Sequence, residues 1–146
     1  MAWPIDFQAD AVLCVPELRS IFAMCASTDS VLGAWHQWDG RQLWRLRAGL
    51  KLLPPLHHVA GLGALCAGCF GGARLYEATT GRWLRQMATE LPLDRVWHFE
   101  EQQLLCARSS EILGLTSQLT VWSTEVLDVA SRGLDPASVG AKSLRI

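Results

Sequence analysis

The sequence has little charge and no strong excess of either sign. Charged residues make up 18% of its 146 positions, and the formal net charge is −1. A chain this close to neutral has no strong field to gather nucleic acid or an anionic membrane. Half of the residues are hydrophobic, which is typical of globular domains and unlike disordered chains. We therefore expect neither a nucleic-acid partner nor a membrane partner.

The sequence also lacks the signs of a secreted or membrane-spanning protein. Its five cysteines are an odd number, which suits a reducing compartment better than a disulfide scaffold. Residues 1–4 carry no basic group, and the first apolar run, residues 11–15, is too short for a signal peptide. The longest apolar stretch, residues 59–72, is rich in glycine and too short to span a bilayer. These absences favour a cytoplasmic or nuclear protein.

A repeated segment dominates what is present. Residues 23–26 (Ala-Met-Cys-Ala) return 41 positions later as residues 64–67 (Ala-Leu-Cys-Ala), and about 40 further on as residues 104–107 (Leu-Leu-Cys-Ala). This alignment places Cys25, Cys66 and Cys106 at one apolar position, where we expect buried, reduced thiols. A period of 40 to 45 residues is typical of β-propeller blades.

The same spacing relates the turns that follow. Residues 39–41 (Asp-Gly-Arg) match residues 80–82 (Thr-Gly-Arg), and Trp35 matches Tyr76, each 41 apart. Residues 57–59 (His-His-Val) match residues 97–99 (Trp-His-Phe), 40 apart. Aspartate followed by glycine is a strong hairpin signal. Several matches in one register predict repeated units of antiparallel strands.

The repeats predict an all-β fold with little outside them. We expect a lead-in over residues 1–10, three repeats over about 11–48, 52–89 and 94–130, and a flexible tail over 131–146. The strands expected are 11–15, 20–26, 31–38, 41–47, 56–59, 64–69, 73–77, 82–87, 95–99 and 103–107, with either 112–115 or 119–122 next. Residues 49–55 are expected to be a linker, since Pro54 and Pro55 cannot sit in a central strand. A helical alternative over 101–115 and 88–99 rests on helix-favouring composition, and the regular turn spacing opposes it.

The repeated unit resembles two related propeller families. Residues 119–123 (Leu-Thr-Val-Trp-Ser) look like the end of a WD repeat, with Ser123 where that family has aspartate. Residues 39–44 (Asp-Gly-Arg-Gln-Leu-Trp) are similar to the turn of pyrroloquinoline-quinone-type repeats, in which a glycine precedes a docking tryptophan by four positions. The second such turn, residues 77–81, has Arg85 where that tryptophan is expected. The resemblance implies a partial propeller of about three four-stranded antiparallel blades.

Three blades are fewer than a closed propeller needs. Propellers usually close with four to eight blades, and open edges pair with other chains. We expect a fragment, a short isoform, or a chain that closes with a partner by supplying or receiving the missing blades. The uncovered end faces are expected to carry Phe22, Met24, Leu104 and Leu105, so the isolated chain should be marginally stable or should self-associate.

Candidate chemistry is sparse. Cys66 and Cys69 form a C-x-x-C pair, but zinc needs four ligands, usually from two such pairs. Residues three apart in a strand point to opposite faces, so these thiols should diverge. His36 near Asp39 lacks a nucleophile, and His57, His58 and His98 suit hydrogen bonding within a blade. We therefore expect no catalytic, cofactor-binding or metal-binding residue.

Tryptophan and arginine are the candidates for binding. Seven tryptophans are many for this length, and packing between blades is the simplest explanation. Some of them could form a protein-binding surface instead, because tryptophan and arginine are typical interface anchors. Arginines on equivalent strands could form a stripe for an acidic partner segment or merely a solvated edge. The residues singled out are Arg41, Arg45, Arg82, Arg85, Trp35 and Trp83.

These observations predict a non-enzymatic scaffold that binds other proteins through its blades. The prediction rests on analogy between folds. One alternative is a quinoprotein-like enzyme domain, which would need acidic and amide metal ligands at the propeller axis. Another is a small zinc-binding module that uses Cys66 and Cys69.

Overall fold

The computed structural model describes residues 5–88, 93–99, 101, 104–110, 117–123 and 142–145. Over these residues the chain forms twelve β-strands and two short 3₁₀ helices, with no α-helix. None of the described residues forms a helix long and apolar enough to cross a membrane. The helical alternative for the third repeat is wrong, because strands occupy residues 93–99 and 104–110.

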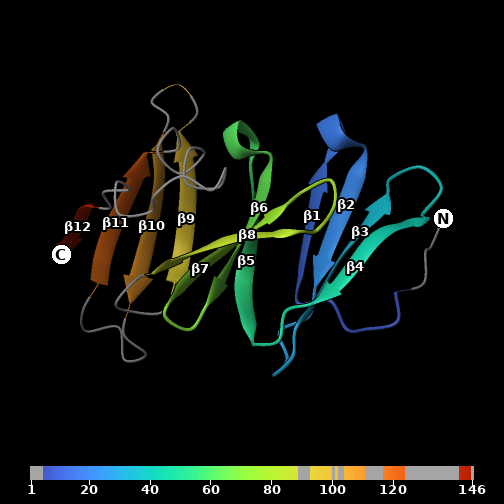
Figure 1. Cartoon of the computed structure of the whole chain (residues 1–146), viewed down its shortest axis with the longest axis horizontal. Coiled ribbons are helices and arrows are strands. Elements are labelled where there is room, and N and C mark those ends of the chain that lie inside the picture. Colours follow the sequence, from blue (N-terminus) through green and yellow to red (C-terminus); the bar gives the residue numbers. More distant parts are fainter. Residues whose placement is uncertain are drawn as a thin grey trace.

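The strands form three four-stranded antiparallel sheets, each made of strands consecutive in the chain (Figure 1). The first sheet holds β1 (Ala11–Val15), β2 (Ser20–Met24), β3 (Val31–His36) and β4 (Gln42–Arg47). The second holds β5 (Leu52–Val59), β6 (Ala64–Cys69), β7 (Gly72–Glu77) and β8 (Trp83–Ala88). The third holds β9 (Leu93–Phe99), β10 (Leu104–Ser110), β11 (Ser117–Ser123) and β12 (Lys142–Arg145). The predicted all-β fold of three blade-like sheets is confirmed.

The three sheets stand side by side in chain order, with the second between the other two (Figure 1). Strand β5 contacts both β1 and β9, so the first strands of the sheets are neighbours. The first strands β1, β5 and β9 form one edge of their sheets. The later strands of each sheet follow in chain order, each antiparallel to the one before. The three blade-like sheets therefore share one line of first strands.

The core consists of two clusters, one on each face of the second sheet. Strand β6 shows why: Leu65, Ala67 and Cys69 pack with the first sheet, while Ala64 and Cys66 pack toward the third. Successive side chains of a strand point to opposite faces, and here both faces are covered. All six residues of β6 are therefore buried, which explains its unbroken run of small and apolar residues.

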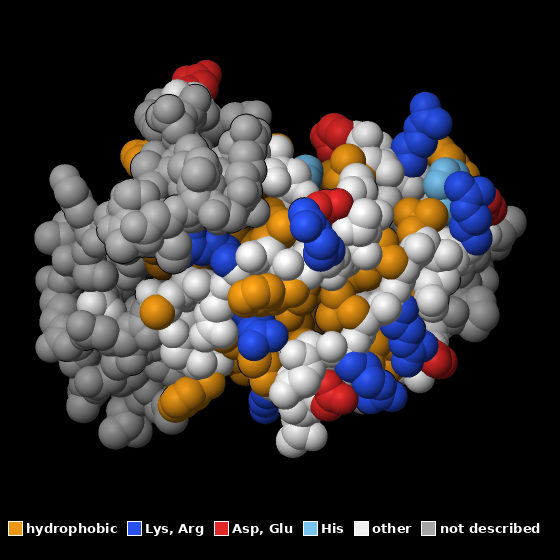
Figure 2. Space-filling model, viewed as in Figure 1, with side chains coloured by type: hydrophobic (Ala, Val, Ile, Leu, Met, Phe, Trp, Pro, Cys, Tyr) orange, Lys and Arg blue, Asp and Glu red, His pale blue; other side chains and the backbone are white. Residues whose placement is uncertain are grey.

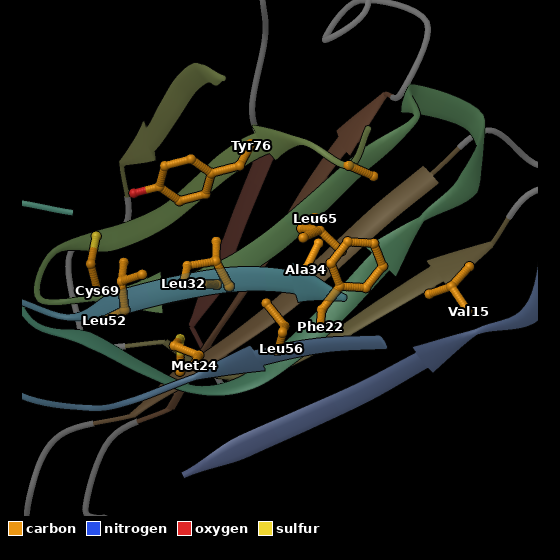
Figure 3. Close-up of a cluster of buried hydrophobic side chains, with 12 residues drawn as sticks. Val15, Phe22, Met24, Leu32, Ala34, Leu52, Leu56, Leu65, Cys69 and Tyr76 are labelled. Carbon is orange, nitrogen blue, oxygen red and sulfur yellow. The ribbon is translucent and has the colours of Figure 1, made fainter. Parts of the chain in front are cut away.

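The cluster between the first two sheets holds the largest fully buried side chains (Figure 3). Phe22 and Met24 are 0% exposed and face the second sheet. The expectation that they lie on an uncovered end face is wrong, because the pleat of β2 points them inward. Full burial of such side chains stabilises the fold by about 1.5 to 3 kcal/mol each.

The repeat has two spacings rather than one. Ser20 pairs with Val15 and His36, whereas Ala64 pairs with Val59 and Glu77. Strands β1 and β2 therefore match β5 and β6 at 44 positions, while β3 and β4 match β7 and β8 at 41. The loop before β3 is four residues longer than the loop before β7, and β2 is one residue shorter than β6, which together account for the difference of three.

This change of spacing corrects the cysteine alignment. Cys66 and Cys106 are equivalent, since both occupy the third position of the second strand, opposite His57 and Trp97. Cys25 instead corresponds to Cys69, three positions later. Cys66 is buried as expected, but Cys25 and Cys106 are only half-buried. All five cysteines are free thiols.

The predicted hairpin turns are equivalent in their hydrogen bonds. The amide of Gly40 donates to the carbonyl of His36 at 2.9 Å, and that of Gly81 donates to the carbonyl of Glu77 at 2.8 Å. Both glycines have positive φ, 69° and 76°, a conformation that glycine adopts without steric cost. The 41-residue match between these turns is confirmed.

Two expected boundaries are wrong. Strand β5 begins at Leu52, inside the expected linker, and includes both prolines. The sheet tolerates them because β5 is an edge strand whose register shifts between Leu53 and Leu56. Strand β12 lies in the expected flexible tail and pairs with β11. The third strand of the third repeat includes residues 119–122, while residues 112–115 lie outside the described part of the chain.

Candidate protein-interaction surface

Equivalent residues show which sheet face lacks a following sheet. Val15, Val59 and Phe99 each end the first strand of their sheet, opposite the first residue of the second strand. Val15 is 3% exposed and Val59 is 0% exposed, because the next sheet covers each of them. Phe99 is 47% exposed. Among the described residues, nothing takes the place of a fourth sheet over it.

The third residues of β2, β6 and β10 show the same difference in exposure between the third sheet and the first two. Phe22 and Cys66 are fully buried, while the equivalent Cys106 is half-buried. Trp97 pairs directly with Cys106 and is 37% exposed. Directly paired residues of antiparallel strands share a face, so the register defines the outward face of the third sheet. We call this surface the β9–β11 face; it consists of Trp97, Phe99, Leu104, Cys106, Leu119 and Val121, together with the paired Arg95 and Arg108.

The opposite face of each sheet carries a buried aromatic residue at one position. Trp35, Tyr76 and Trp122 are equivalent residues of the third strands, paired with the second residues of β2, β6 and β10. They are 6%, 2% and 3% exposed. Tyr76 packs in the cluster shared with the first sheet, and Trp122 packs in the cluster shared with the second. Each aromatic residue therefore faces the preceding sheet.

Among the described strands no sheet precedes the first one, and residues 5–10 cover Trp35 instead. The ring of Phe7 lies 5.9 Å from the ring of Trp35, centroid to centroid. The guanidinium of Arg45 lies 5.7 Å from the Phe7 centroid and forms an ion pair with Asp6. That hydrogen bond from Arg45 lowers the pKa of Asp6. We call residues 5–10 the N-terminal strap.

Backbone hydrogen bonds fix the end of the strap to the first sheet. The amide of Asp10 donates to the carbonyl of Met24 at 2.8 Å, and the Asp10 carboxylate accepts from the amide of Ala26 at 2.7 Å. Earlier residues of the strap are held by the side chains of Asp6 and Phe7. The strap thus acts as a small cover for part of the first sheet's outer face.

Acidic side chains lie beside three of the four arginines singled out as either a binding stripe or a solvated edge. Arg41 pairs with Asp39 at 3.1 Å, and Arg82 pairs with Glu77 at 3.0 Å. Hydrogen bonds from Arg82 and then Thr80 lower the pKa of Glu77. Figure 2 shows basic side chains in separate groups, with acidic side chains beside several of them. This arrangement favours a solvated edge over a stripe for an acidic partner.

The remaining predicted residues divide into buried and exposed. Trp35 is 6% exposed, because the ring of Phe7 lies against it, so it offers little surface for a partner while the strap is in place. Trp83 is 52% exposed and is accessible. Arg85 occupies the position equivalent to Trp44, and its Nε and Nη1 atoms are buried with no hydrogen-bond partner in the described structure. Burial lowers its pKa.

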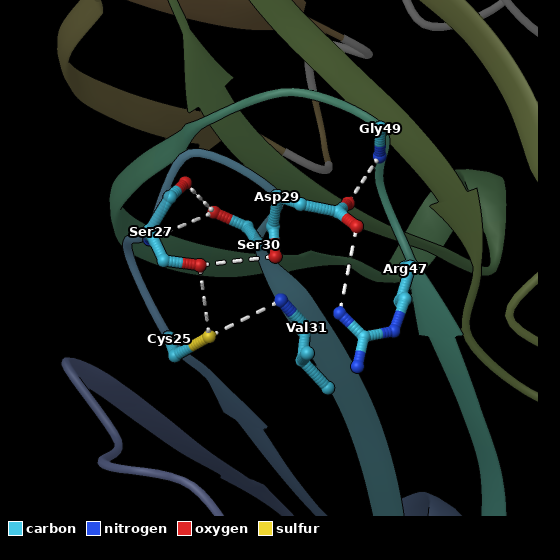
Figure 4. Close-up of polar contacts among 7 residues, drawn as sticks. All are labelled: Cys25, Ser27, Asp29, Ser30, Val31, Arg47 and Gly49. Carbon is cyan, nitrogen blue, oxygen red and sulfur yellow. Dashed lines mark hydrogen bonds and ion pairs between the residues drawn. The ribbon is translucent and has the colours of Figure 1, made fainter.

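The loop after β2 is a structural network (Figure 4). The Cys25 thiol accepts a hydrogen bond from the amide of Val31 at 3.2 Å. Asp29 accepts from the amide of Gly49 at 2.9 Å and pairs with Arg47 at 3.5 Å. Ser30 accepts from the amide of Leu52 at 2.8 Å, which joins the loop to the start of β5. These contacts position the second sheet against the first.

The C-x-x-C thiols diverge as predicted. Cys69 belongs to the cluster toward the first sheet, and Cys66 belongs to the cluster toward the third. Burial, and then the nearby Cys69, raises the pKa of Cys66 to about 12, and burial also raises the pKa of Cys69. Protonated thiols on opposite faces suit neither a shared metal nor a redox pair. No group of three or more His, Cys, Asp or Glu within the described residues could hold a metal ion.

No protein-family model matches the sequence, and no curated protein matches it significantly.

The sequence analysis did not identify the β9–β11 face as a candidate binding surface. Period-two alternation in residues 95–99 could have placed Trp97 and Phe99 on one face. The role of Phe7 had no comparable signal, because the strap has no period of its own.

Proposed function

We propose that the chain is a non-catalytic scaffold that binds another protein through the β9–β11 face. The exposure of Phe99, set against the full burial of its equivalent Val59, carries this proposal. Exposed aromatic residues gathered on one sheet face are typical of an interaction site. The partner that fits is a protein surface able to cover a blade-like sheet. The near-neutral chain supports a protein partner rather than nucleic acid or membrane.

We further propose that the sheets are propeller repeats of the WD or pyrroloquinoline-quinone type. The equivalent aromatic residues Trp35, Tyr76 and Trp122 occupy positions like that of the WD-repeat tryptophan near the end of the third strand. Trp44 packs on Gly81 of the next sheet, which supports the pyrroloquinoline-quinone-type alternative of a docking tryptophan. Both resemblances support blades as interaction surfaces. The diverging thiols of Cys66 and Cys69 oppose the zinc module, and the five free thiols suit a cytoplasmic or nuclear location.

The test compares proteins captured from a cell extract by three purified, tagged chains. One is unchanged, one carries Trp97→Thr and Phe99→Thr, and the control carries Phe70→Thr. Threonine retains strand propensity while removing the aromatic surface. Phe70 is 81% exposed but lies in the turn before β7, away from the β9–β11 face. Equal melting temperatures establish that all three chains are folded.

We expect at least one protein to bind the unchanged chain and the Phe70 control but not the double variant. Its purified form should then lose roughly tenfold or more in affinity for the double variant, since anchor residues typically contribute more than 1 kcal/mol each. If every captured protein binds the double variant as well as the unchanged chain, the β9–β11 face is not the interaction site.

A further inference from the structure

We infer that the β9–β11 face of one chain binds the first sheet of a second copy, and that the N-terminal strap competes with this contact. This inference rests on the proposed function, whose partner it names. The first and third described sheets present complementary halves of the same repeated junction. The third sheet has the face that, in the other two sheets, receives a following sheet. The first sheet has the buried aromatic residue that, in the other two sheets, faces a preceding sheet.

The two junctions inside the chain define what the β9–β11 face accepts. In each, the covering element is a four-stranded antiparallel sheet whose third strand carries Tyr76 or Trp122 toward its neighbour. The first sheet has the same architecture and carries Trp35 at the same position. It is the one sheet among the described strands whose aromatic residue is not covered by another sheet. A second copy therefore supplies an occupant of the same form as the internal ones.

The outer face of the first sheet is suited to this contact. Register places five residues of β1 to β3 on it, since Val12 pairs with Ala23, Cys14 with Ile21, and Ile21 with Trp35. Four of these five residues are apolar, and Arg45 of β4 shares the face through the pairing of Gly33 with both Ala23 and Arg45. Val12 is 64% exposed, so the strap leaves this part of the face uncovered. A second chain would bury Val12 and replace Phe7 over Trp35.

Two copies joined in this way would close. A ring of two copies has two identical junctions related by a twofold axis, the commonest symmetry of protein oligomers. The described residues of two copies together supply six blade-like sheets, within the usual range of closed propellers. Closure also removes both uncovered end faces at once, which a single added partner sheet would not do.

The first residues of the strap, 5–7, are held by few contacts, whereas its end at Asp10 is fixed by hydrogen bonds. Their charged contact is an exposed ion pair: the Asp6 side chain is 68% exposed and that of Arg45 is 28% exposed. Such pairs contribute little to stability. Their apolar contact with the sheet is the single ring of Phe7 against Trp35. A four-stranded sheet would cover far more of the same face, so it would compete effectively once the strap is weakened.

Sedimentation equilibrium of the full chain tests the inference. The strap-release variant carries Asp6→Asn and Phe7→Ser, and its matched control carries Ile5→Ser, a change in the same strap at a residue that is 37% exposed. A third chain adds Phe99→Thr to the strap-release changes. Asp6→Asn alone weakens the strap without altering apolar packing. Circular dichroism and thermal melting establish folding of each chain.

We expect strap release to lower the dimer dissociation constant at least tenfold, with a smaller decrease for Asp6→Asn and none for Ile5→Ser. Adding Phe99→Thr should restore the original constant. The inference is overturned if strap release leaves self-association unchanged, if the dimer persists with Phe99→Thr, or if open assemblies larger than dimers form. In any of these cases, loss of a captured partner through Trp97→Thr and Phe99→Thr would still support the proposed function, so the two failures are distinguishable.

Discussion

The indole Nε1 of Trp44 donates a hydrogen bond to the carbonyl oxygen of Ala78 at a distance of 3.0 Å. Trp44 lies on the last strand of the first sheet, and Ala78 begins the turn after β7 in the second. The same indole fills the space beside Gly81, where an added Cβ would stand 2.5 Å from Cε3 of Trp44. One side chain thus joins consecutive sheets through both a hydrogen bond and a close contact.

Gly81→Ala should destabilise the fold more than Gly49→Ala does. Both glycines have positive φ, 76° and 72°, so both substitutions incur similar backbone strain of about 1 to 2 kcal/mol. Only at Gly81 does the new Cβ meet Trp44, since nothing lies within 4 Å of the corresponding position at Gly49. Overpacking of this kind costs about 1 to 3 kcal/mol more. Urea unfolding of both variants measures the difference.

A double-mutant cycle separates this clash from other effects at Gly81. In a Trp44→Ala background, Gly81→Ala should cost no more than Gly49→Ala does. An excess cost that persists without the indole would show that Trp44 does not determine the space at Gly81.

Trp44→Phe should lower the free energy of unfolding by about 1 kcal/mol through the lost hydrogen bond. Phenylalanine retains an aromatic ring against Phe22, whose centroid lies 6.0 Å from that of Trp44, but it cannot donate to Ala78. Chemical denaturation gives the value. A variant as stable as the unchanged protein would show that the hydrogen bond contributes nothing net.

Thiol labelling should follow burial rather than the sequence alignment. Cys14 is exposed and should react first, Cys25 and Cys106 are half-buried and should follow, and Cys66 and Cys69 should react last. The pKa of Cys66, raised to about 12, leaves almost no thiolate at pH 8. Mass spectrometry of peptides after timed alkylation measures each rate. Labelling of Cys66 as fast as Cys14 in folded protein would contradict the described core.

Acidification should destabilise the protein through His57. Burial, and then the positive charge of Arg95, lowers the pKa of His57 below its usual 6.5. The unfolded state therefore binds more protons in this range, so the contribution of neutral His57 is complete above pH 6.5 and is lost as the pH falls. His57→Gln should make the melting temperature depend less on pH between 7.5 and 5.5. If the melting temperatures of the unchanged protein and of His57→Gln depend equally on pH, His57 does not cause the acid destabilisation.

The sequence predicted the sheets better than it predicted their faces. Turn residues such as Gly40 and Gly81 have strong local preferences, so the hairpins could be located from short patterns. The strand at residues 64–69 was predicted with its observed bounds. The position of Cys25 was misaligned because a longer loop before β3 changes the spacing inside one repeat. Loop length is weakly constrained energetically, so a single fixed period is a poor guide across it.

The candidate site was less predictable because it depends on what covers each sheet. Trp35 and Trp83 look alike in sequence, but Phe7 covers the first while the second is exposed. Arg41 and Arg82 looked like a stripe, yet each lies beside a carboxylate in its own turn. The contact of Phe7 with Trp35 depends on tertiary structure, and the two arginine–carboxylate pairs depend on turn geometry. Neither kind of contact can be predicted from the pattern of apolar residues along a strand.

Cysteine substitution at Val59 and Phe99 tests the central claim most directly. The two positions are equivalent in consecutive sheets, and they differ in that the next sheet covers only the first. We predict that the thiol of Phe99→Cys is alkylated in the folded chain at least tenfold faster than that of Val59→Cys, as measured by mass spectrometry of the labelled peptides. If both thiols react equally slowly, the β9–β11 face is covered, and the proposed interaction surface does not exist.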